Sequence, residues 1–276
     1  MRPETLSHEI ESGGDESGRV RPSESSTTPA GRLGGRLWYW WSLLVAALLL
    51  LIVGPPAIII SYLSGRRERL YPYALFGARN WLRLSGVKVR VRGREHLDPR
   101  QSYVFAANHR SFLDTATLFY YTGRRIGIIA KKELLKVPIF GYGMGYVNIM
   151  AIDRSNNKRA VETMKAATDR LRRGVSFGVF AEGTRALPGE LLPFKKGAFY
   201  MAAEAGVPVV PVAIKNTDAL MGKGTGVARP GEIEMVLLPP VSTAGVKTDE
   251  EVKRLAEHVN ALVAEELGVK AQVKGG

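Results

Sequence analysis

The sequence predicts an α/β domain, a mixed sheet flanked by helices, preceded by a hydrophobic membrane anchor. Three observations lead to this fold class. Short apolar runs typical of strands alternate with helical patterns after residue 65, and this interleaving is typical of α/β domains. A stretch of 27 residues without a charge, 37–63, lies near the N-terminus. The 276-residue chain has no cysteine, so its core must be stable without disulfide bonds.

The N-terminal residues 1–36 are predicted to form a disordered polar tail. They are rich in Ser, Gly, Glu and Arg and poor in large apolar side chains, a composition that cannot build a packed core. The formal net charge is +13, and the tail contains five Arg against six acidic residues. The basic excess therefore lies in the rest of the chain, where it would attract nucleic acid, acidic lipid head groups or phosphorylated substrates.

Residues 37–65 are predicted to be the membrane anchor. Residues 37–53 would form about 25 Å of helix, near the lower limit for crossing a hydrocarbon core of ~30 Å. Four aromatic residues at positions 38–41 suit the lipid–water interface. The segment Gly54-Pro55-Pro56 is expected to break the helix.

Two topologies fit this anchor: a kinked helix that crosses the bilayer, and a helical hairpin that dips in and returns. Arginines lie on both flanks of the apolar run, which slightly favours the hairpin and places the rest of the chain on the cytoplasmic face. A membrane-attached protein makes nucleic acid the weaker candidate for the basic surface.

Residues 66–276 are predicted to form the α/β domain. Its expected strands lie at residues 87–91, 102–107, 126–130, 176–181, 207–214 and 233–238. Helical patterns cover residues 112–121 and 158–173, the second with Ser155 or Asn156 as its cap and Gly174 at its end. A capping box at residues 248–251 opens a further helix, which Gly268 ends.

The pair His109 and Asp114 is the first candidate for chemistry. It follows the apolar run at 103–107, which reads as a buried strand, and catalytic groups favour such strand ends in α/β folds. A histidine can take up a proton near neutral pH, and a nearby carboxylate can orient its ring and stabilise its charged form. The pair could therefore activate a hydroxyl group. A thiolate nucleophile is excluded because the chain has no cysteine.

A second group of residues, 182–185, follows the strand at 176–181. An acid, a glycine, a hydroxyl and a guanidinium in sequence could hold a phosphate or a polar head group, because the arginine fork binds two oxygens. Basic residues also follow other predicted strands or apolar stretches, and they could converge on one anion. They are Lys131, Lys132, Arg154, Lys195 and Lys196.

Three other motifs are given structural interpretations. Residues 174–178 match the G-x-S-x-G pattern of a serine hydrolase, but Ser176 stands between a helix and a following strand, the reverse of the required order. A zinc site is disfavoured because only His96 and Asp98 lie near the candidate pair in sequence and no thiolate exists. The Gly-rich residues 222–226 lack the Gly-Lys-Ser/Thr of a P-loop and are interpreted as a mobile loop.

Four segments in order resemble the motif blocks of the glycerolipid acyltransferase family, above all the 1-acyl-sn-glycerol-3-phosphate acyltransferases. They are residues 108–114, 152–154, 180–185 and 207–212. The resemblance covers about residues 80–240 and includes an N-terminal hydrophobic anchor, so it implies the glycerol-3-phosphate acyltransferase-like fold.

The resemblance implies acyl transfer to the free hydroxyl of lysophosphatidate, which gives phosphatidic acid in phospholipid biosynthesis. His109 is similar to the family's general base and Asp114 to its orienting partner. The acceptor-binding block is represented by Glu182, Gly183, Thr184 and Arg185, and the phosphate ligands by Arg154 and Lys131. Acyl-CoA or acyl-carrier protein would be the donor, and no metal or cofactor would be required.

Several alternatives remain open at this stage. Within the same family, the acceptor could be another lysolipid or glycerol 3-phosphate. A non-catalytic membrane adaptor with this fold would have no need for the residues His109, Asp114 and 182–185. A serine hydrolase that uses Ser176 is opposed by the order of its flanking elements.

Overall fold

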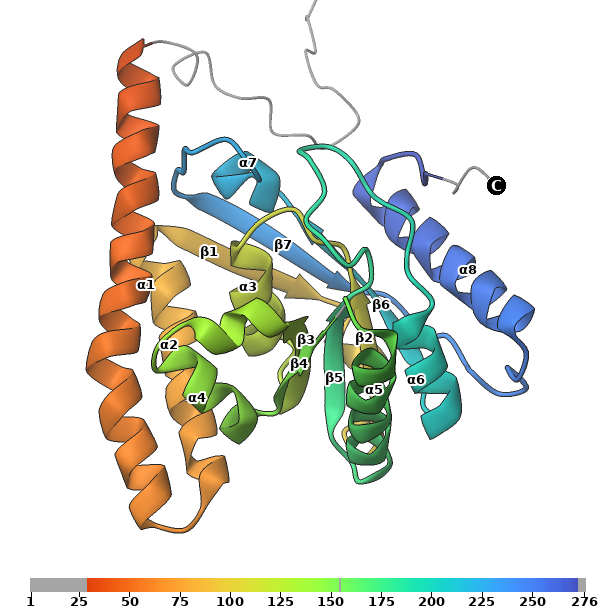
Figure 1. Ribbon diagram of the computed structural model, residues 1–276. Helices are drawn as coiled ribbons and strands as arrows, with labels where there is room; N and C mark the ends of the chain where they lie inside the picture. Colours follow the sequence, from red (N-terminus) through yellow and green to blue (C-terminus); the bar gives the residue numbers. More distant parts are fainter. Residues whose placement is uncertain (1–28, 154, 273–276) are drawn as a thin grey trace, which may run out of the picture.

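The computed structural model describes residues 29–153 and 155–272 (Figure 1). Seven strands form one sheet in the order β1-β7-β6-β2-β5-β3-β4. The pair β6–β7 is antiparallel and the other neighbouring pairs are parallel. The strands are β1 (Val87–Arg92), β2 (Val104–Ala107), β3 (Ile126–Lys131), β4 (Ile149–Ile152), β5 (Ser176–Phe180), β6 (Val209–Lys215) and β7 (Gly231–Leu237). The mixed sheet confirms the predicted fold class.

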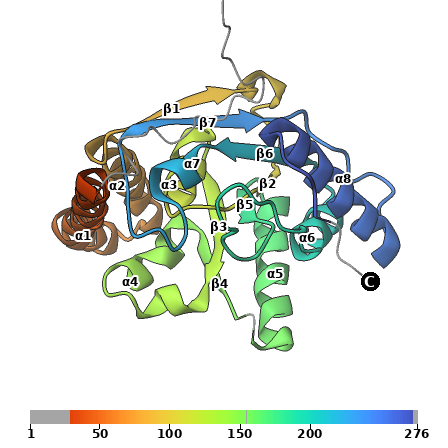
Figure 2. The same cartoon turned by 90° about the horizontal axis from the view of Figure 1, so that it is seen from above.

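Helices cover both faces of the sheet. Viewed from above, α1 to α4 lie on one side of it and α5, α6 and α8 on the other (Figure 2). The helices are α1 (Pro29–Leu63), α2 (Leu70–Leu84), α3 (Leu113–Tyr121), α4 (Phe140–Met144), α5 (Asn157–Arg172), α6 (Gly197–Ala205), α7 (Thr217–Met221) and α8 (Asp249–Leu267).

The sheet separates two hydrophobic cores. On β2, Phe105 and Ala107 face the core under α1 to α4, whereas Val104 and Ala106 face the core under α5, α6 and α8. All four residues of β2 are buried, as expected for a central strand that is covered on both faces. The candidate pair therefore follows a strand that packing holds from both sides.

The six predicted strands are present, with ends shifted by a few residues. Asn156 caps α5 by accepting a hydrogen bond from Arg159 N, and the capping box of Thr248 and Glu251 opens α8. Helix α2 was not predicted, although core residues such as Tyr71, Ala78 and Leu82 recur along it at helical spacing. Strand β4 was not predicted because it has only four residues.

The helix break predicted at Gly54-Pro55-Pro56 is wrong, and so is the start of the helix at residue 37. A single helix, α1, runs through both prolines and begins at Pro29. Residues 29–36 of the predicted disordered tail are therefore helical, and residues 1–28 of it lie outside the described residues. Each proline removes one intrahelical hydrogen bond. The helix nevertheless continues because it is packed just before and just after the prolines: Gly54 lies against Ile139, and Ala57 is buried in the core. At 1.5 Å per residue its 35 residues extend about 52 Å.

Helix α2 runs antiparallel to α1 and lies beside it (Figure 1). The pair is joined by hydrogen bonds from the indole N–H of Trp38 to Ser85 O (3.0 Å) and from that of Trp81 to Ser42 O (3.0 Å). The hydroxyls of Ser42 and Ser85 are 2.8 Å apart. The hairpin therefore consists of α1 and α2, with its turn at residues 64–69, and not of two halves of the apolar run.

Helix α1 also contacts the α/β domain near both ends. Ala228 N donates to Gly35 O at 2.8 Å, and a Cβ added at Gly54 would come 2.6 Å from Ile139 Cγ2. Among the described residues, the segment Ala30–Leu63 is the one helix long and apolar enough to cross a membrane. Its outward face exposes large apolar side chains: Leu37, Trp40, Leu44, Leu48, Leu51, Ile52, Ile59 and Ile60.

Candidate functional site

The loops that bear most of the candidate residues meet at one edge of the sheet. Strands β2, β5, β3 and β4 are parallel neighbours, so the segments that follow them leave the sheet on the same side. His109 follows β2, Glu182 follows β5, Lys131 ends β3 and Asp153 follows β4. This is the edge at which ligands bind in open α/β sheets.

The predicted pair is in contact. His109 Nδ1 lies 2.9 Å from Asp114 Oδ2. The carboxylate can only accept when ionised, so Nδ1 donates and Nε2 is the ring atom that carries the free lone pair. The imidazole stacks on Phe180, with 4.0 Å between ring centroids and 19° between planes. The ring is 16% exposed, so Nε2 is held in one orientation and can still reach a substrate.

Asp114 organises the whole loop. It lies in the first turn of α3 and is completely buried. Its Oδ2 also accepts the backbone N–H groups of Arg110 and Ser111, each at 2.7 Å. These two N–H groups and the His109 ring hold the carboxylate in one orientation. The carboxylate of Asp114 is therefore held in a fixed position against the His109 ring.

Glu182 is buried between two loops and does not face solvent. One carboxylate oxygen accepts His109 N at 2.5 Å and the other accepts Leu192 N at 2.8 Å. The residue is 2% exposed. Burial raises the pKa of Glu182 to about 7, although the two N–H donors and Arg110 act in the opposite direction. The side chain ties the loop after β5 to the backbone of the candidate base.

We expect the stability of the protein to depend on pH through Glu182. The pKa of its carboxyl is about 7 in the folded state against an ordinary value of 4.5, so the folded protein keeps a proton that the unfolded chain releases. This contribution is complete below about pH 4.5 and is lost as the pH rises through about 7. It amounts to about 3 kcal/mol at most. Glu182→Gln has no titrating group and should lack this decline.

Denaturant unfolding of both proteins between about pH 5 and pH 8 checks this expectation. The free energy of unfolding of the parent chain should fall more steeply with pH than that of Glu182→Gln. Parallel pH profiles for the two proteins would contradict the expectation.

The rest of the 182–185 segment is more accessible. Gly183 has φ +75°, a left-handed conformation that favours glycine. Thr184 is exposed. The guanidinium of Arg185 lies 3.8 Å from the centroid of the Phe112 ring. The backbone carbonyl of Arg185 accepts a hydrogen bond from the ammonium of Lys223 at 2.5 Å. Arg185 therefore lies beside the loop that carries the His109–Asp114 pair.

The basic residues predicted to converge on one anion have different surroundings in the structure. Lys131 is exposed at the end of β3, and Arg154 lies outside the described residues. Lys132 forms an ion pair with Asp153 at 2.7 Å. This lysine, together with Ser155, lowers the pKa of Asp153 to about 2. Lys195 lies over Gly183, whereas Lys196 pairs with Asp249.

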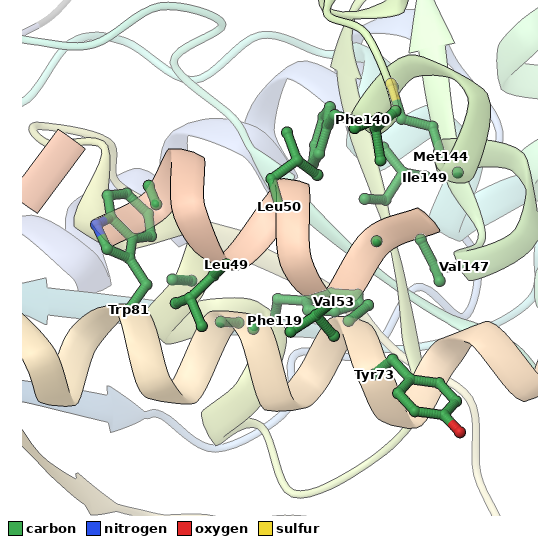
Figure 3. A pocket seen from close by; sticks show the side chains of 18 of the residues that line it. Leu49, Leu50, Val53, Tyr73, Trp81, Phe119, Phe140, Met144, Val147 and Ile149 are labelled. Atoms are coloured by element: carbon green, nitrogen blue, oxygen red, sulfur yellow. The ribbon is translucent and has the colours of Figure 1, made fainter. Parts of the chain in front are cut away.

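A large apolar cavity lies beside the loop that carries the pair. Its volume is about 570 Å³, and it lies between α1, α2, α3 and α4, with Ile128 of β3 and Ile149 of β4 also in its wall. Figure 3 shows side chains from these elements, including Leu50, Trp81 and Phe140, around it. Phe112 lines the cavity and carries Arg185 on its ring, so the cavity begins next to the loop of His109 and Asp114.

The sequence analysis missed this cavity. Its lining residues come from positions 46 to 149, and each of them resembles an ordinary core residue. The signal that could have found it is the surplus of small residues on the inner face of the anchor and of α2. These are Ala46, Ala47, Gly54, Ala57, Ala74, Gly77 and Ala78.

The structural interpretation of Ser176 is confirmed by its position. It begins β5, at the opposite edge of the sheet from His109, and its hydroxyl accepts Tyr103 N at 3.1 Å. His96 Nδ1 lies 3.1 Å from Leu237 O. Within residues 29–153 and 155–272, no group of three or more His, Asp or Glu could hold a metal ion.

The Gly-rich segment predicted to be mobile is tied to the site in this structure. Gly222 forms a β-bridge with Ser111, and Lys223 N donates to Arg110 O at 3.3 Å. The segment therefore covers the loop between His109 and Asp114. Sequence reasoning had no signal for this contact, because glycine-rich composition is common to mobile and to closely packed loops.

Comparison with known proteins identifies relatives of this chain. Residues 88–215 match the family model described as Acyltransferase. The chain is 38% identical over 178 residues to "1-acyl-sn-glycerol-3-phosphate acyltransferase alpha" of Mus musculus, which covers 64% of this chain and 62% of that protein. It is 35% identical over 177 residues to "1-acyl-sn-glycerol-3-phosphate acyltransferase" of Saccharomyces cerevisiae, covering 63% of this chain and 58% of that protein. The chain thus spans about 60% of the length of these curated relatives.

A solved structure matches the fold. It is that of the 1-acyl-sn-glycerophosphate (LPA) acyltransferase PlsC from Thermotoga maritima, with a TM-score of 0.73 and 28% sequence identity. The match covers 88% of this chain and 99% of that one. The similarity therefore includes part of the N-terminal helices as well as the sheet.

Proposed function

We propose that this chain, whose residues 88–215 match the Acyltransferase family model, makes phosphatidic acid. It transfers a fatty acyl group from a thioester to the free hydroxyl of 1-acyl-glycerol-3-phosphate. The observation that carries the proposal is the His109–Asp114 pair, with Nδ1 and Oδ2 2.9 Å apart, in a loop whose Phe112 lines an apolar cavity.

The proposed reaction uses the chain's own groups. His109 Nε2 takes the proton of the acceptor hydroxyl, and the hydroxyl oxygen attacks the thioester carbonyl carbon. The new ester C–O bond forms, the C–S bond breaks, and the imidazolium gives the proton to the departing thiolate. Asp114 stabilises the imidazolium between these steps. A positioned base of this kind contributes about 10²–10⁴-fold in rate.

The apolar cavity suits an acyl chain. It has aliphatic and aromatic walls, and burial of alkyl groups is favourable by about 0.8 kcal/mol per CH₂. Because Phe112 belongs both to its wall and to the loop of the pair, a chain inside it would have its carboxyl end near His109. The polar part of a thioester donor, acyl-CoA or acyl-carrier protein, is anionic and would remain outside on the basic surface of the chain, whose net charge is +13.

The proposed ligands of the acceptor's phosphate are Arg185, Lys131 and Arg154. We expect Arg185→Ala to raise the KM for lysophosphatidate about tenfold or more, because a hydrogen bond to a charged group contributes about 1.5–3 kcal/mol. The KM for the thioester should be unchanged. Steady-state kinetics with each substrate varied in turn check this. An effect confined to the thioester would refute the role of Arg185.

The experiment that tests the function is a substrate panel with purified protein. Lysophosphatidate should be the best acceptor among lysophosphatidate, glycerol 3-phosphate and lysolipids with other head groups. Both donor types, acyl-CoA and acyl-carrier protein, are compared. Preference for another lysolipid or for glycerol 3-phosphate would support the alternative within the family. No transfer with any pair would support a non-catalytic membrane adaptor.

We propose that α1 and α2 attach the protein to the cytoplasmic face of the membrane without crossing it. The α/β domain contacts α1 at Gly35 and again at Gly54, positions about 28 Å apart along a helix. This distance is close to the whole ~30 Å thickness of the hydrocarbon core. A helix that crossed the bilayer would therefore bring polar loops of the domain into lipid, which is costly. The exposed apolar face of α1 would lie along one leaflet.

The absence of cysteine allows a direct test of this topology. Single cysteines at Gly34 and at Glu68, both exposed, mark the two ends of α1. In sealed membrane vesicles a membrane-impermeant maleimide should label both positions from the cytoplasmic side. Labelling of the two positions from opposite sides would establish a helix that crosses the membrane.

A further inference from the structure

We propose that Lys195 is a further cationic ligand of the acceptor's phosphate, acting with Arg185 to select phosphate monoesters. The inference rests on the proposed function and extends it to the choice among acceptors. Lys195 belongs to the Lys195-Lys196-Gly197 segment, which no step of the proposed reaction uses.

The backbone places Lys195 beside the loop of the candidate base. Its N–H donates to Ala181 O at 2.8 Å, directly before Glu182, whose carboxylate accepts His109 N. The chain after Leu192 thus returns to the end of β5. Lys195 consequently lies at the same edge of the sheet as His109, although 86 positions separate them in the sequence.

The side chain of Lys195 lies across Gly183. A Cβ added at residue 183 would come 2.8 Å from Lys195 Cε and 2.9 Å from Nζ. Residue 183 therefore leaves room for this ammonium group by lacking a side chain. The ammonium lies over the loop between Glu182 and Thr184, within one residue of the group that holds the backbone of His109.

Lys195 differs from Lys196 in the partners it has. Lys196 Nζ is 2.7 Å from both carboxylate oxygens of Asp249. Lys195 is exposed, and among residues 29–153 and 155–272 no carboxylate lies within 4.0 Å of its ammonium group. Arg185 likewise has no acidic partner among the described residues; it stacks on Phe112. Two cations without an acidic partner among the described residues therefore belong to the segment between β5 and α6.

A phosphate monoester is the anion that this arrangement suits. It carries a charge of about −1.5 to −2 at neutral pH and three acceptor oxygens, so it can engage two cations at once. Arg185 offers a planar fork and Lys195 a compact point charge with three donors. A head group in which a quaternary amine neutralises the phosphate would gain less from the second cation.

The test compares Lys195→Ala, Lys195→Arg and the matched neighbour Lys196→Ala, all in the full chain. We expect Lys195→Ala to raise the KM for lysophosphatidate about tenfold while kcat and the KM for the thioester stay within about twofold. Lys195→Arg should restore most of the affinity because it keeps the charge. Lys196→Ala should behave as the parent chain. Equal KM values for the parent and Lys195→Ala would overturn the proposal, and so would equal effects of Lys195→Ala and Lys196→Ala.

A binding measurement separates this proposal from the proposed function. Calorimetric titration of the detergent-solubilised protein with lysophosphatidate, and with lysophosphatidylcholine for comparison, needs no turnover. Lys195→Ala should lose affinity for lysophosphatidate and little for lysophosphatidylcholine. If the parent chain binds lysophosphatidate through Lys195 but transfers no acyl group, the proposed function fails and the assignment of Lys195 stands. If the parent chain shows no preference for lysophosphatidate, the assignment fails.

Discussion

Replacement of His109 by Ala is expected to lower the rate of acyl transfer by at least about 100-fold. The proposed base would be gone, and general base catalysis contributes about 10²–10⁴-fold. The fold should persist, because the ring contributes one hydrogen bond to Asp114 and one stacking contact with Phe180. Asp114 would keep its two bonds from the N–H groups of Arg110 and Ser111. The measurement is kcat with lysophosphatidate and a saturating thioester.

His96→Ala is the matched control for this variant. His96 belongs to the same domain, and its ring faces Leu237 O at the end of β7. Strand β6 separates this strand from β2 and the loop that follows it. It should retain the activity of the parent chain. Circular dichroism and membrane sedimentation should show that both variants are folded and bound to the membrane. A His109→Ala protein with the full activity of the parent chain would contradict the proposed mechanism.

Replacement of Asp114 by Asn should have the second largest effect, a loss of about 100-fold or more in kcat. Asp114 Oδ2 accepts three donors, from His109, Arg110 and Ser111. The carboxamide oxygen of Asn can still face the two backbone donors, but it carries no charge to stabilise the imidazolium. If the side-chain amide of Asn flips, its NH₂ group faces the backbone N–H groups of Arg110 and Ser111, which then lose their acceptor.

This variant should also lose stability, since a buried donor without a partner costs about 1–3 kcal/mol. The measurements are kcat and the midpoint of thermal unfolding. Asp169→Asn is the control, because Asp169 is an exposed residue that pairs with Arg172; it should leave both quantities unchanged. An Asp114→Asn protein with the kcat of the parent chain would show that the carboxylate does not serve the base.

The His109–Asp114 pair could be predicted from the sequence because its geometry is local. The two residues are five positions apart, and a buried strand followed by the first turn of a helix is enough to bring them together. The capping box of α8 and the Asn156 cap of α5 could be predicted for the same reason, since their partners are three residues apart. Strands were predicted where apolar runs were long, and β4, with four half-buried residues, was missed.

Glu182 shows where sequence reasoning reaches its limit. Its position in a polar block indicated contact with a substrate, whereas its carboxylate is buried and binds the backbone of His109 and Leu192. Residue type and order are the same in either case. Only the return of the chain at residue 192 determines which groups the carboxylate faces.

The sequence by itself determined the α/β class, the apolar N-terminal segment and the pairing of His109 with Asp114, because each depends on composition or on residues close in the chain. The tertiary structure decided the rest. It carried α1 through Pro55 and Pro56 by packing it between α2 and Ile139. It formed the cavity from several separate helices and strands, and it gave Lys196 a counter-ion that Lys195 lacks among the described residues. These features depend on contacts between residues far apart in the chain, whose energies are absent from any local window of sequence.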